Sequence, residues 1–360
     1  MPKFSPKITR KIRHLIYYIF YIFLLLEISS RAFLTIKFNA SFFKPSIILF
    51  NFYPELKDLK QQDLSKNNGK FDFLLLGGSV LHPKWGDIEE LLLEAFIQNN
   101  YNDIRIHNLS RIAHTSLDSY YKYDQLKNKS FDLVLVYHGI NEVRANNCPE
   151  KVFKNDYSHY KWYRLINQIK AHNEINLITF PYVCDLAYLQ LKELIFPPAI
   201  VPGHAPRKDW IKYGTVIKTR KSFSSNLKKI ITLSRNKHEP IILLTFAYYV
   251  PADYSLDRFN KKVLDYGQHL SPIEIWGTPQ NVVKGIEAHN QVVRTLAQNF
   301  CTCFVDMEKL IPKEGKYFED ICHLTHAGSE KFVENVLPLV EKIYASYKHE
   351  ASLKFPHTKI

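Results

Sequence analysis

Three side chains in this sequence have the types and the spacing of a nucleophile and the base that activates it. Ser79 comes directly after the apolar run 71–76 and a Gly-Gly pair. Glycines allow a tight turn that lifts a serine hydroxyl off the end of a strand and leaves its backbone N–H free to face a bound oxygen. Asp320 and His323 are three residues apart in "YFEDICHLTHAG". On a turn, this spacing lets the carboxylate hold one imidazole nitrogen while the other nitrogen faces Ser79.

Two further segments carry groups that suit the stabilisation of a negatively charged oxygen. In "HGINE" (138–142), Gly139 permits a tight loop, and Asn141 can aim an amide donor into a crevice. The segment "NLSRIAHTS" (108–116) follows another apolar run. Taken singly, these patterns are typical of a turn, a capped loop or a local hydrogen bond. Because all four follow different predicted strands in chain order, chance is the poorer explanation, and a catalytic set is favoured.

The elements that must hold these residues are those of an α/β protein. Short apolar runs alternate with longer helical patterns, which is the order expected of a doubly wound, flavodoxin-like three-layer sandwich with a mainly parallel five-stranded sheet. In such sheets the ligand crevice lies beyond the carboxyl ends of the strands, where the segments above begin. The predicted strands cover 71–76, 103–108, 131–137, 240–246 and 302–307, and the predicted helices include 88–98, 222–234, 286–299 and 327–344.

We predict four segments along the chain. Residues 1–36 form a basic cytoplasmic tail and a membrane anchor or signal segment, 37–70 a linker, 71–346 the α/β domain with an insertion at 146–221, and 347–360 a C-terminal tail. The insertion is too long for a simple crossover between strands, and it is richer in aromatic and basic residues than its surroundings.

The N-terminal segment is typical of a membrane helix. Residues 15–26 form an unbroken apolar run of 12 residues, and the pattern extends over 20 residues to Leu34 if Glu27 and Arg31 pair at i, i+4. We favour an uncleaved anchor; the alternatives are a signal peptide cleaved at the small-x-small site 30–32 and a buried helix of a soluble protein. Five basic residues among the first 13 favour a cytoplasmic N-terminus, so both membrane interpretations place the α/β domain outside the cytoplasm.

The composition excludes several classes of protein. The 360 residues are 46% hydrophobic, which suffices for a full core and excludes a disordered or fibrous chain. The five cysteines are odd in number and form no C-x-x-C pair, so neither a zinc site nor a disulfide framework is predicted. Outside the first 13 residues the net charge is +8, which is no nucleic-acid signature. We expect no metal and no cofactor, because His82, His114 and His138 lack acidic partners at ligand spacing.

In order, spacing and setting, these motifs resemble the four blocks of the SGNH (GDSL-like) hydrolase family. "LLLGGSV" (74–80) is similar to the serine block, with Gly78 where many members have Asp, "YHGINE" to the third block and "DICHLTHAG" to the last. In the second block the usual glycine falls at Ala113, or at Ser110 in the other register. An alanine keeps the N–H that the family uses, but it costs about 1 kcal/mol or more if the position needs a positive φ. The N-terminal apolar segment resembles that of membrane-anchored members associated with bacterial polysaccharides.

The resemblance implies a role for each of these residues. Ser79 is expected to attack an ester carbonyl, His323 to take and return the serine proton, and Asp320 to orient the imidazole. The oxyanion hole and its supporting turns are expected to comprise Ser79, Ala113, Asn141, Gly78 and Gly139.

The resemblance also implies a class of activity. The expected protein is a serine esterase that removes acyl groups, acetyl above all, from a carbohydrate or cell-surface polysaccharide. The alternatives are an O-acyltransferase of the same fold, a non-catalytic glycan-binding or assembly protein, and a lipase. The expected partners are an acylated glycan or small ester and the membrane, with no nucleic acid. The expected location is membrane-anchored with the catalytic domain in the periplasm or at the cell surface, or secreted after signal cleavage.

Overall fold

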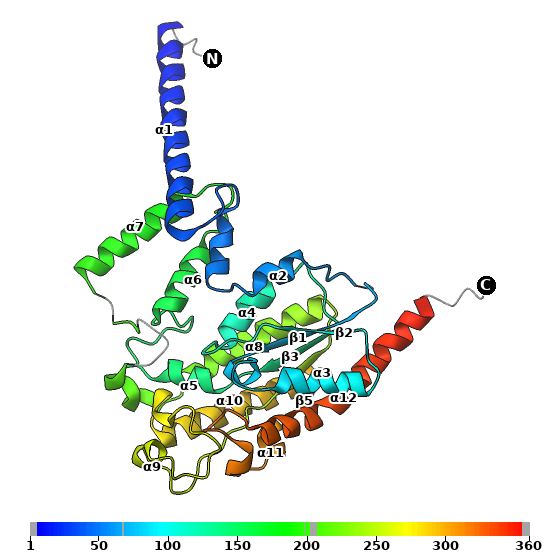
Figure 1. Ribbon diagram of the computed structural model, residues 1–360. Helices are drawn as coiled ribbons and strands as arrows, with labels where there is room; N and C mark the ends of the chain where they lie inside the picture. The colour runs from blue at the N-terminus through cyan, green and yellow to red at the C-terminus, as the bar shows by residue number, and fades with distance from the viewer. Residues whose placement is uncertain (1–5, 67, 198, 202–206, 355–360) are drawn as a thin grey trace, which may run out of the picture. The chain divides into compact units, whose positions relative to one another are not determined.

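The computed structural model describes residues 6–66, 68–197, 199–201 and 207–354 (Figure 1). Contacts divide the chain into two compact units. The first comprises the described residues of Met1–Pro54 and Lys161–Ile200, and the second those of Glu55–Tyr160 and Val201–Ile360. All the predicted site residues belong to the second unit.

The second unit is built on a parallel five-stranded sheet with the strand order β2-β1-β3-β4-β5. The strands are β1 (Phe71–Gly77), β2 (Ile104–Asn108), β3 (Leu133–Tyr137), β4 (Ile241–Leu244) and β5 (Cys303–Val305). Every residue of β1, β3 and β4 is buried, as expected of apolar runs in strands that are covered on both faces. The predicted doubly wound fold is confirmed, and the strands lie at the five predicted positions.

Helices cover both faces of this sheet. On one face, α8 (Thr219–Asn236) packs against α4 (Ser116–Gln125) and α10 (Pro279–Phe300). On the other face, α3 (Ile88–Gln98) packs against α12 (His326–Lys354) (Figure 1). Helix α12 therefore runs into the predicted C-terminal tail, and residues 355–360 of that tail lie outside the described residues.

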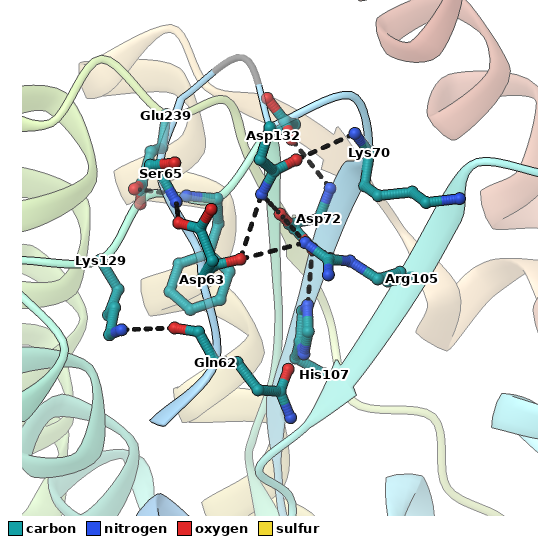
Figure 2. A network of polar contacts seen from close by, with 12 residues as sticks. Gln62, Asp63, Ser65, Lys70, Asp72, Arg105, His107, Lys129, Asp132 and Glu239 are labelled. Carbon is teal, nitrogen blue, oxygen red and sulfur yellow. Dashed lines mark hydrogen bonds and ion pairs between the residues drawn. The ribbon is translucent and has the colours of Figure 1, made fainter. Parts of the chain in front are cut away.

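A polar network joins β1 to β2 at the amino ends of these strands (Figure 2). The buried Asp72 carboxylate accepts hydrogen bonds from Arg105 Nε and from His107 Nε2, both at 2.8 Å. Burial alone would raise the pKa of Asp72, but the hydrogen bonds from His107 and Arg105 outweigh it and lower that pKa. Burial raises the pKa of the neighbouring Asp132 to about 6. The hydrogen bonds to Asp72 join β1 to β2 at the edge of the sheet opposite to the predicted site.

The first unit is a small group of helices. It contains α1 (Pro6–Phe38), the 3-10 helix η1 (Pro45–Asn51), α6 (Lys161–Ala171) and α7 (Phe180–Ile195). Buried Leu34, Ile48 and Ile169 belong to its core. Within α1, Arg10–Phe38 is long and apolar enough to span a membrane or to act as a signal sequence. The predicted Glu27–Arg31 pair is present, with 2.6 Å between Arg31 Nε and Glu27 Oε1.

These two units cut across the predicted segments. The predicted linker 37–70 contributes η1 to the first unit and α2 (Leu56–Gln61) to the second. Ile48 and Leu56 are buried, so the described part of this stretch is folded into the units rather than free between them. Within the predicted insertion 146–221, Lys161–Ile200 joins the N-terminal helix, because packing and hydrogen bonds attach it there.

Candidate active site

Two loops at the carboxyl edge of the sheet bring the predicted nucleophile, base and acid together. Ser79 begins the 3-10 helix η2 (Ser79–Leu81) directly after β1, while Asp320 and His323 lie between η5 (Gly315–Tyr317) and α12. Ser79 Oγ is 2.9 Å from His323 Nε2, and His323 Nδ1 is 2.7 Å from Asp320 Oδ2. All three side chains are buried. The arrangement has the geometry of a Ser-His-Asp triad.

The turn that carries Asp320 makes this carboxylate a rigid support for His323. Its second oxygen, Oδ1, accepts hydrogen bonds from the backbone N–H groups of Cys322 and His323, both at 2.9 Å. The N–H of Glu319 donates to the carbonyl of His323 at 2.8 Å and closes the turn. Because an ionised carboxylate only accepts, the ring proton lies on Nδ1, and Nε2 is left to accept the proton of Ser79.

Asn141 lies in α5 (Ile140–Asn146), which follows β3. Its amide nitrogen donates to the carbonyl of His114 at 2.9 Å, and its amide oxygen accepts from Trp276 Nε1 at 3.4 Å. These two contacts determine which way the amide faces.

The two glycines predicted to support the turns supply space rather than an unusual backbone conformation. The φ angles are −95° at Gly78 and 176° at Gly139, which any residue adopts. A Cβ at Gly78 would lie 2.8 Å from Asn141 Nδ2, and a Cβ at Gly139 would lie 2.6 Å from Phe246 Cβ. Glycine at position 78 therefore allows the Asn141 amide to lie against the serine turn.

Ala113 has the backbone conformation that is unfavourable for alanine. Its φ is +65°, in the left-handed region that favours glycine, and of the two candidate positions only Ala113, not Ser110, has a positive φ. Buried Arg144 of α5 donates from Nη2 to the carbonyl of Ala113 at 2.7 Å. The Asn141 amide holds the next carbonyl along the chain. Two side chains of α5 thus hold the strained loop in place.

Two tryptophans that the sequence interpretation missed flank His323. The ring centroid of Trp85 is 4.9 Å from that of His323, and the ring centroid of Trp276 is 6.4 Å from it. Trp85 follows η2, and Trp276 ends the long loop after β4. Both tryptophans follow strands whose carboxyl ends form the site, and this position in the chain could have identified them. Aromatic rings this close to the buried imidazole lower the local polarity, which strengthens its hydrogen bonds.

A cavity of about 760 Å³ opens beside Trp85. Leu324, the neighbour of His323 in the chain, belongs to its lining. Burial raises the pKa of Glu319, and the hydrogen bond to Asp87 raises the pKa of His326. The charged side chains of the lining are Lys84, Asp87, Glu89, Glu90, Glu319 and His326.

The histidines that follow other strands do not form a shared metal site in the described part of the chain. His138 Nε2 is 2.7 Å from Ser119 Oγ, and burial lowers the pKa of His138 to about 3. His82 Nδ1 accepts from the backbone N–H of Lys84 at 3.1 Å. Metal-binding side chains do cluster at Asp320, Cys322 and His323, but burial raises the pKa of the Cys322 thiol. A protonated thiol is a poor ligand, and the expectation of no metal and no cofactor stays a prediction.

No protein-family model and no curated protein matches this sequence. Several solved structures are similar to it at low identity. A GDSL-like lipase from Bacteroides thetaiotaomicron is 14% identical, with 81% of this chain and 98% of that chain covered and a TM-score of 0.45. An acetylxylan esterase from Geobacillus stearothermophilus is 12% identical (77% and 95% covered, TM-score 0.41), as is a lipase/acylhydrolase from Enterococcus faecalis (76% and 96% covered, TM-score 0.40). Similarity at this level decides neither family nor activity.

Proposed function

We propose that the protein is a serine esterase that removes acyl groups, acetyl above all, from a carbohydrate, as its resemblance to SGNH hydrolases implies. The observation that supports this most is the pair of hydrogen bonds that runs from Ser79 through His323 to Asp320. A protein that only binds glycans has no use for a buried base in contact with a serine hydroxyl.

In the proposed reaction, Ser79 Oγ attacks the ester carbonyl while His323 Nε2 takes the serine proton. His323 then gives this proton to the oxygen of the leaving alcohol, and an acyl-serine remains. A water molecule that loses its proton to the same imidazole attacks the acyl-serine. The imidazolium then returns this proton to Ser79 Oγ as the bond to the acyl carbon breaks and the acid is released. Asp320 stabilises the imidazolium that forms in both steps.

The developing negative charge on the carbonyl oxygen needs donors that are already in place. We assign this role to the N–H groups of Ser79 and Ala113 and to the side-chain amide of Asn141. Two observations support the assignment. The absence of a Cβ at Gly78 leaves room for the Asn141 amide, and Arg144 donates a hydrogen bond to the Ala113 carbonyl. Strain at Ala113 does not remove its N–H, so the alanine is compatible with activity.

The cavity beside Trp85 supports a sugar as the alcohol part of the ester. An indole face can stack on a sugar ring, and carboxylates such as Asp87 and Glu89 can accept hydrogen bonds from hydroxyl groups. A lining with this many charged groups suits a polar sugar better than a long hydrocarbon chain. An O-acyltransferase of the same fold would differ only in that a sugar hydroxyl, rather than water, takes the acyl group.

We further propose that α1 is retained as a membrane anchor and that the active site lies outside the cytoplasm. The apolar side chains of residues 15–26 are exposed along α1, which suits contact with lipid. The charged residues that follow, Glu27 and Arg31, pair with each other. Basic residues before the span favour a cytoplasmic N-terminus.

Release of acetate from an acetylated sugar tests the proposed activity. The full chain, purified in detergent, is compared with Ser79→Ala and Asp320→Asn on glucose pentaacetate. We expect both variants to lose about 10⁴-fold in turnover, the first through the nucleophile and the second through the wrong imidazole tautomer. Transfer of acetyl groups to an added sugar acceptor without release of free acetate would favour the acyltransferase. Equal turnover by wild type and Ser79→Ala would contradict the proposal.

A further inference from the structure

Helix α7 exposes an apolar stripe along its length. Exposed side chains at helical spacing are Cys184, Ala187, Tyr188, Leu191, Leu194 and Ile195. Leu194 is 80% exposed and Tyr188 is 65% exposed. Residues that recur at i, i+3, i+4 and i+7 share one face of a helix, so these six residues form one continuous surface, the α7 stripe.

The opposite face of α7 is already used in the packing of the first unit. Tyr182 and Leu186 are buried, and Glu193 pairs with Arg164 of α6 at 3.2 Å. The α7 stripe is therefore not the core-facing side of the helix. Proteins rarely leave so many large apolar side chains together on one surface unless that surface meets a partner or a membrane.

Hydrogen bonds attach the start of α7 to α1, the helix that can span a membrane. Glu27 of α1 accepts hydrogen bonds from the backbone N–H groups of Thr179 at 2.8 Å and Phe180 at 3.1 Å. Arg31 donates to two backbone carbonyls just before α7, at 3.1 and 3.0 Å. Figure 1 shows α7 leaving from this end of α1. Glu27, which holds the start of α7, directly follows the unbroken apolar run 15–26, so α7 starts where the most apolar part of α1 ends, close to the membrane surface.

Further apolar side chains are exposed where α1 ends. Ile36, Phe43 and Leu177 are 87%, 85% and 84% exposed. They lie near the end of α1, in the segment that follows it, and in the segment just before α7. Exposed apolar side chains therefore extend from the proposed span to the α7 stripe.

We propose that α7 is an interfacial helix that lies on the outer surface of the bilayer, with the α7 stripe among the lipid acyl chains. Lipid is the expected partner of this surface, because the proposed membrane-spanning helix α1 belongs to the same unit as α7. Lys192, whose Nζ lies 6.0 Å from the ring centre of Tyr188, can reach a phosphate headgroup from the edge of the stripe. The inference rests on the proposed retention of α1 as an anchor, and it is independent of esterase activity.

Spin labels on the full chain test this placement in liposomes of equal parts phosphatidylcholine and phosphatidylglycerol. The background carries serine at the cysteines that are not buried, Cys184, Cys301 and Cys303. One nitroxide at a time is attached at Leu191→Cys on the stripe, at Gln190→Cys as the matched exposed polar neighbour, or at Ile19→Cys on α1. Collisions with oxygen, which dissolves in lipid, are compared with collisions with a water-soluble nickel chelate.

We expect the ratio of oxygen to nickel collisions to be several-fold higher at position 191 than at position 190, and high at position 19. A label at 191 that meets nickel as often as the label at 190 would overturn the placement of α7. A label at 191 that meets neither reagent would show that protein covers the stripe, which also overturns it. A label at position 19 that collides freely with nickel would show that α1 does not span the membrane, which contradicts the proposed anchor. Ester turnover is measured separately, so a failure of the proposed activity is distinguished from a failure of the anchor.

Discussion

Ala113 adopts a φ of +65° that glycine reaches without strain. The left-handed conformation costs an alanine about 1–2 kcal/mol, while the added freedom of glycine in the unfolded chain costs about 0.4–1 kcal/mol. We therefore expect Ala113→Gly to stabilise the folded protein by about 0.5–1 kcal/mol, seen as a higher midpoint of thermal unfolding. The matched control is Ala145→Gly inside helix α5, which should destabilise. A lower midpoint for Ala113→Gly would show that the methyl group contributes more through packing than it costs in strain.

Asn141 is the proposed oxyanion donor whose side chain can be removed without altering Ser79, His323 or Asp320. Loss of one such donor costs about 10²–10³ in turnover, so the kcat of Asn141→Ala should fall by that factor. The same substitution removes the hydrogen bonds to the His114 carbonyl and from Trp276 Nε1, so the thermal midpoint should fall as well, and kcat is measured well below that midpoint. Trp276→Phe keeps the ring beside His323 but removes the N–H that holds the Asn141 oxygen, and it should show a smaller loss in kcat. An Asn141→Ala variant with wild-type kcat would exclude this amide from the oxyanion hole.

Residue types and places in the chain predict the triad but not the whole site. Ser79 could be found because it follows a buried parallel strand at the carboxyl edge of the sheet, and Asp320 and His323 because of their three-residue spacing past the last strand. The sign of φ at Ala113 depends on how the loop is held by Arg144, which no local pattern reveals. Trp85 was missed because a tryptophan in a loop carries no spacing signal until the loop is folded over His323.

At the scale of elements, the sheet and its helices follow from local patterns, whereas the first unit does not. The runs that became β1 and β3 are apolar at every position or nearly so, and their short length is typical of strands covered on both faces. The pairing of α1 with α7 joins residues 152 positions apart, Glu27 and Thr179, and leaves no periodic trace in either segment. The packing of α1 against α7 is therefore the feature of the fold that could not be predicted from the sequence.

Helix α5 holds the loop of Ala113 through Arg144, and we propose that this contact positions the oxyanion hole. Arg144→Met removes the hydrogen bond to the Ala113 carbonyl, so we expect kcat to fall about tenfold or more while KM changes little. Arg144→Lys should recover part of the loss. The matched control is Arg105→Met, which breaks a similar bond at the opposite edge of the sheet and should lower stability without lowering kcat. Equal effects of the two methionine variants on kcat would contradict a positioning role for α5.

At the scale of the whole molecule, buried histidines make the stability of the fold depend on pH. Burial lowers the pKa of His138 to about 3, and burial likewise lowers the pKa values of His159 and His289 to about 4. Between these values and the unfolded pKa of about 6.5, the unfolded chain binds protons that the folded chain does not. The three histidines therefore cost no stability well above pH 6.5, and they lower the free energy of unfolding as the pH falls below it. Burial raises the pKa of Glu142 to about 7, which opposes this loss.

A variant isolates the contribution of one histidine from these opposing effects. We expect the free energy of unfolding of wild type, relative to His138→Gln, to fall by about 1.5 kcal/mol between pH 6.5 and pH 5, since each pKa unit is worth about 1.4 kcal/mol. Urea unfolding of both proteins at the two pH values measures the difference. A difference that does not change with pH would show that His138 has the same pKa in the folded and the unfolded state.

The proposed activity rests on one claim about the molecule, that Ser79 is activated by His323. Reaction of the full chain with a fluorophosphonate, followed by mass spectrometry of the peptides, tests this claim most directly. A covalent adduct on Ser79 in the wild type that is absent in a folded His323→Ala variant is the predicted result. No adduct on a folded wild-type protein, or an adduct on Ser79 that persists in His323→Ala, would contradict an activated serine.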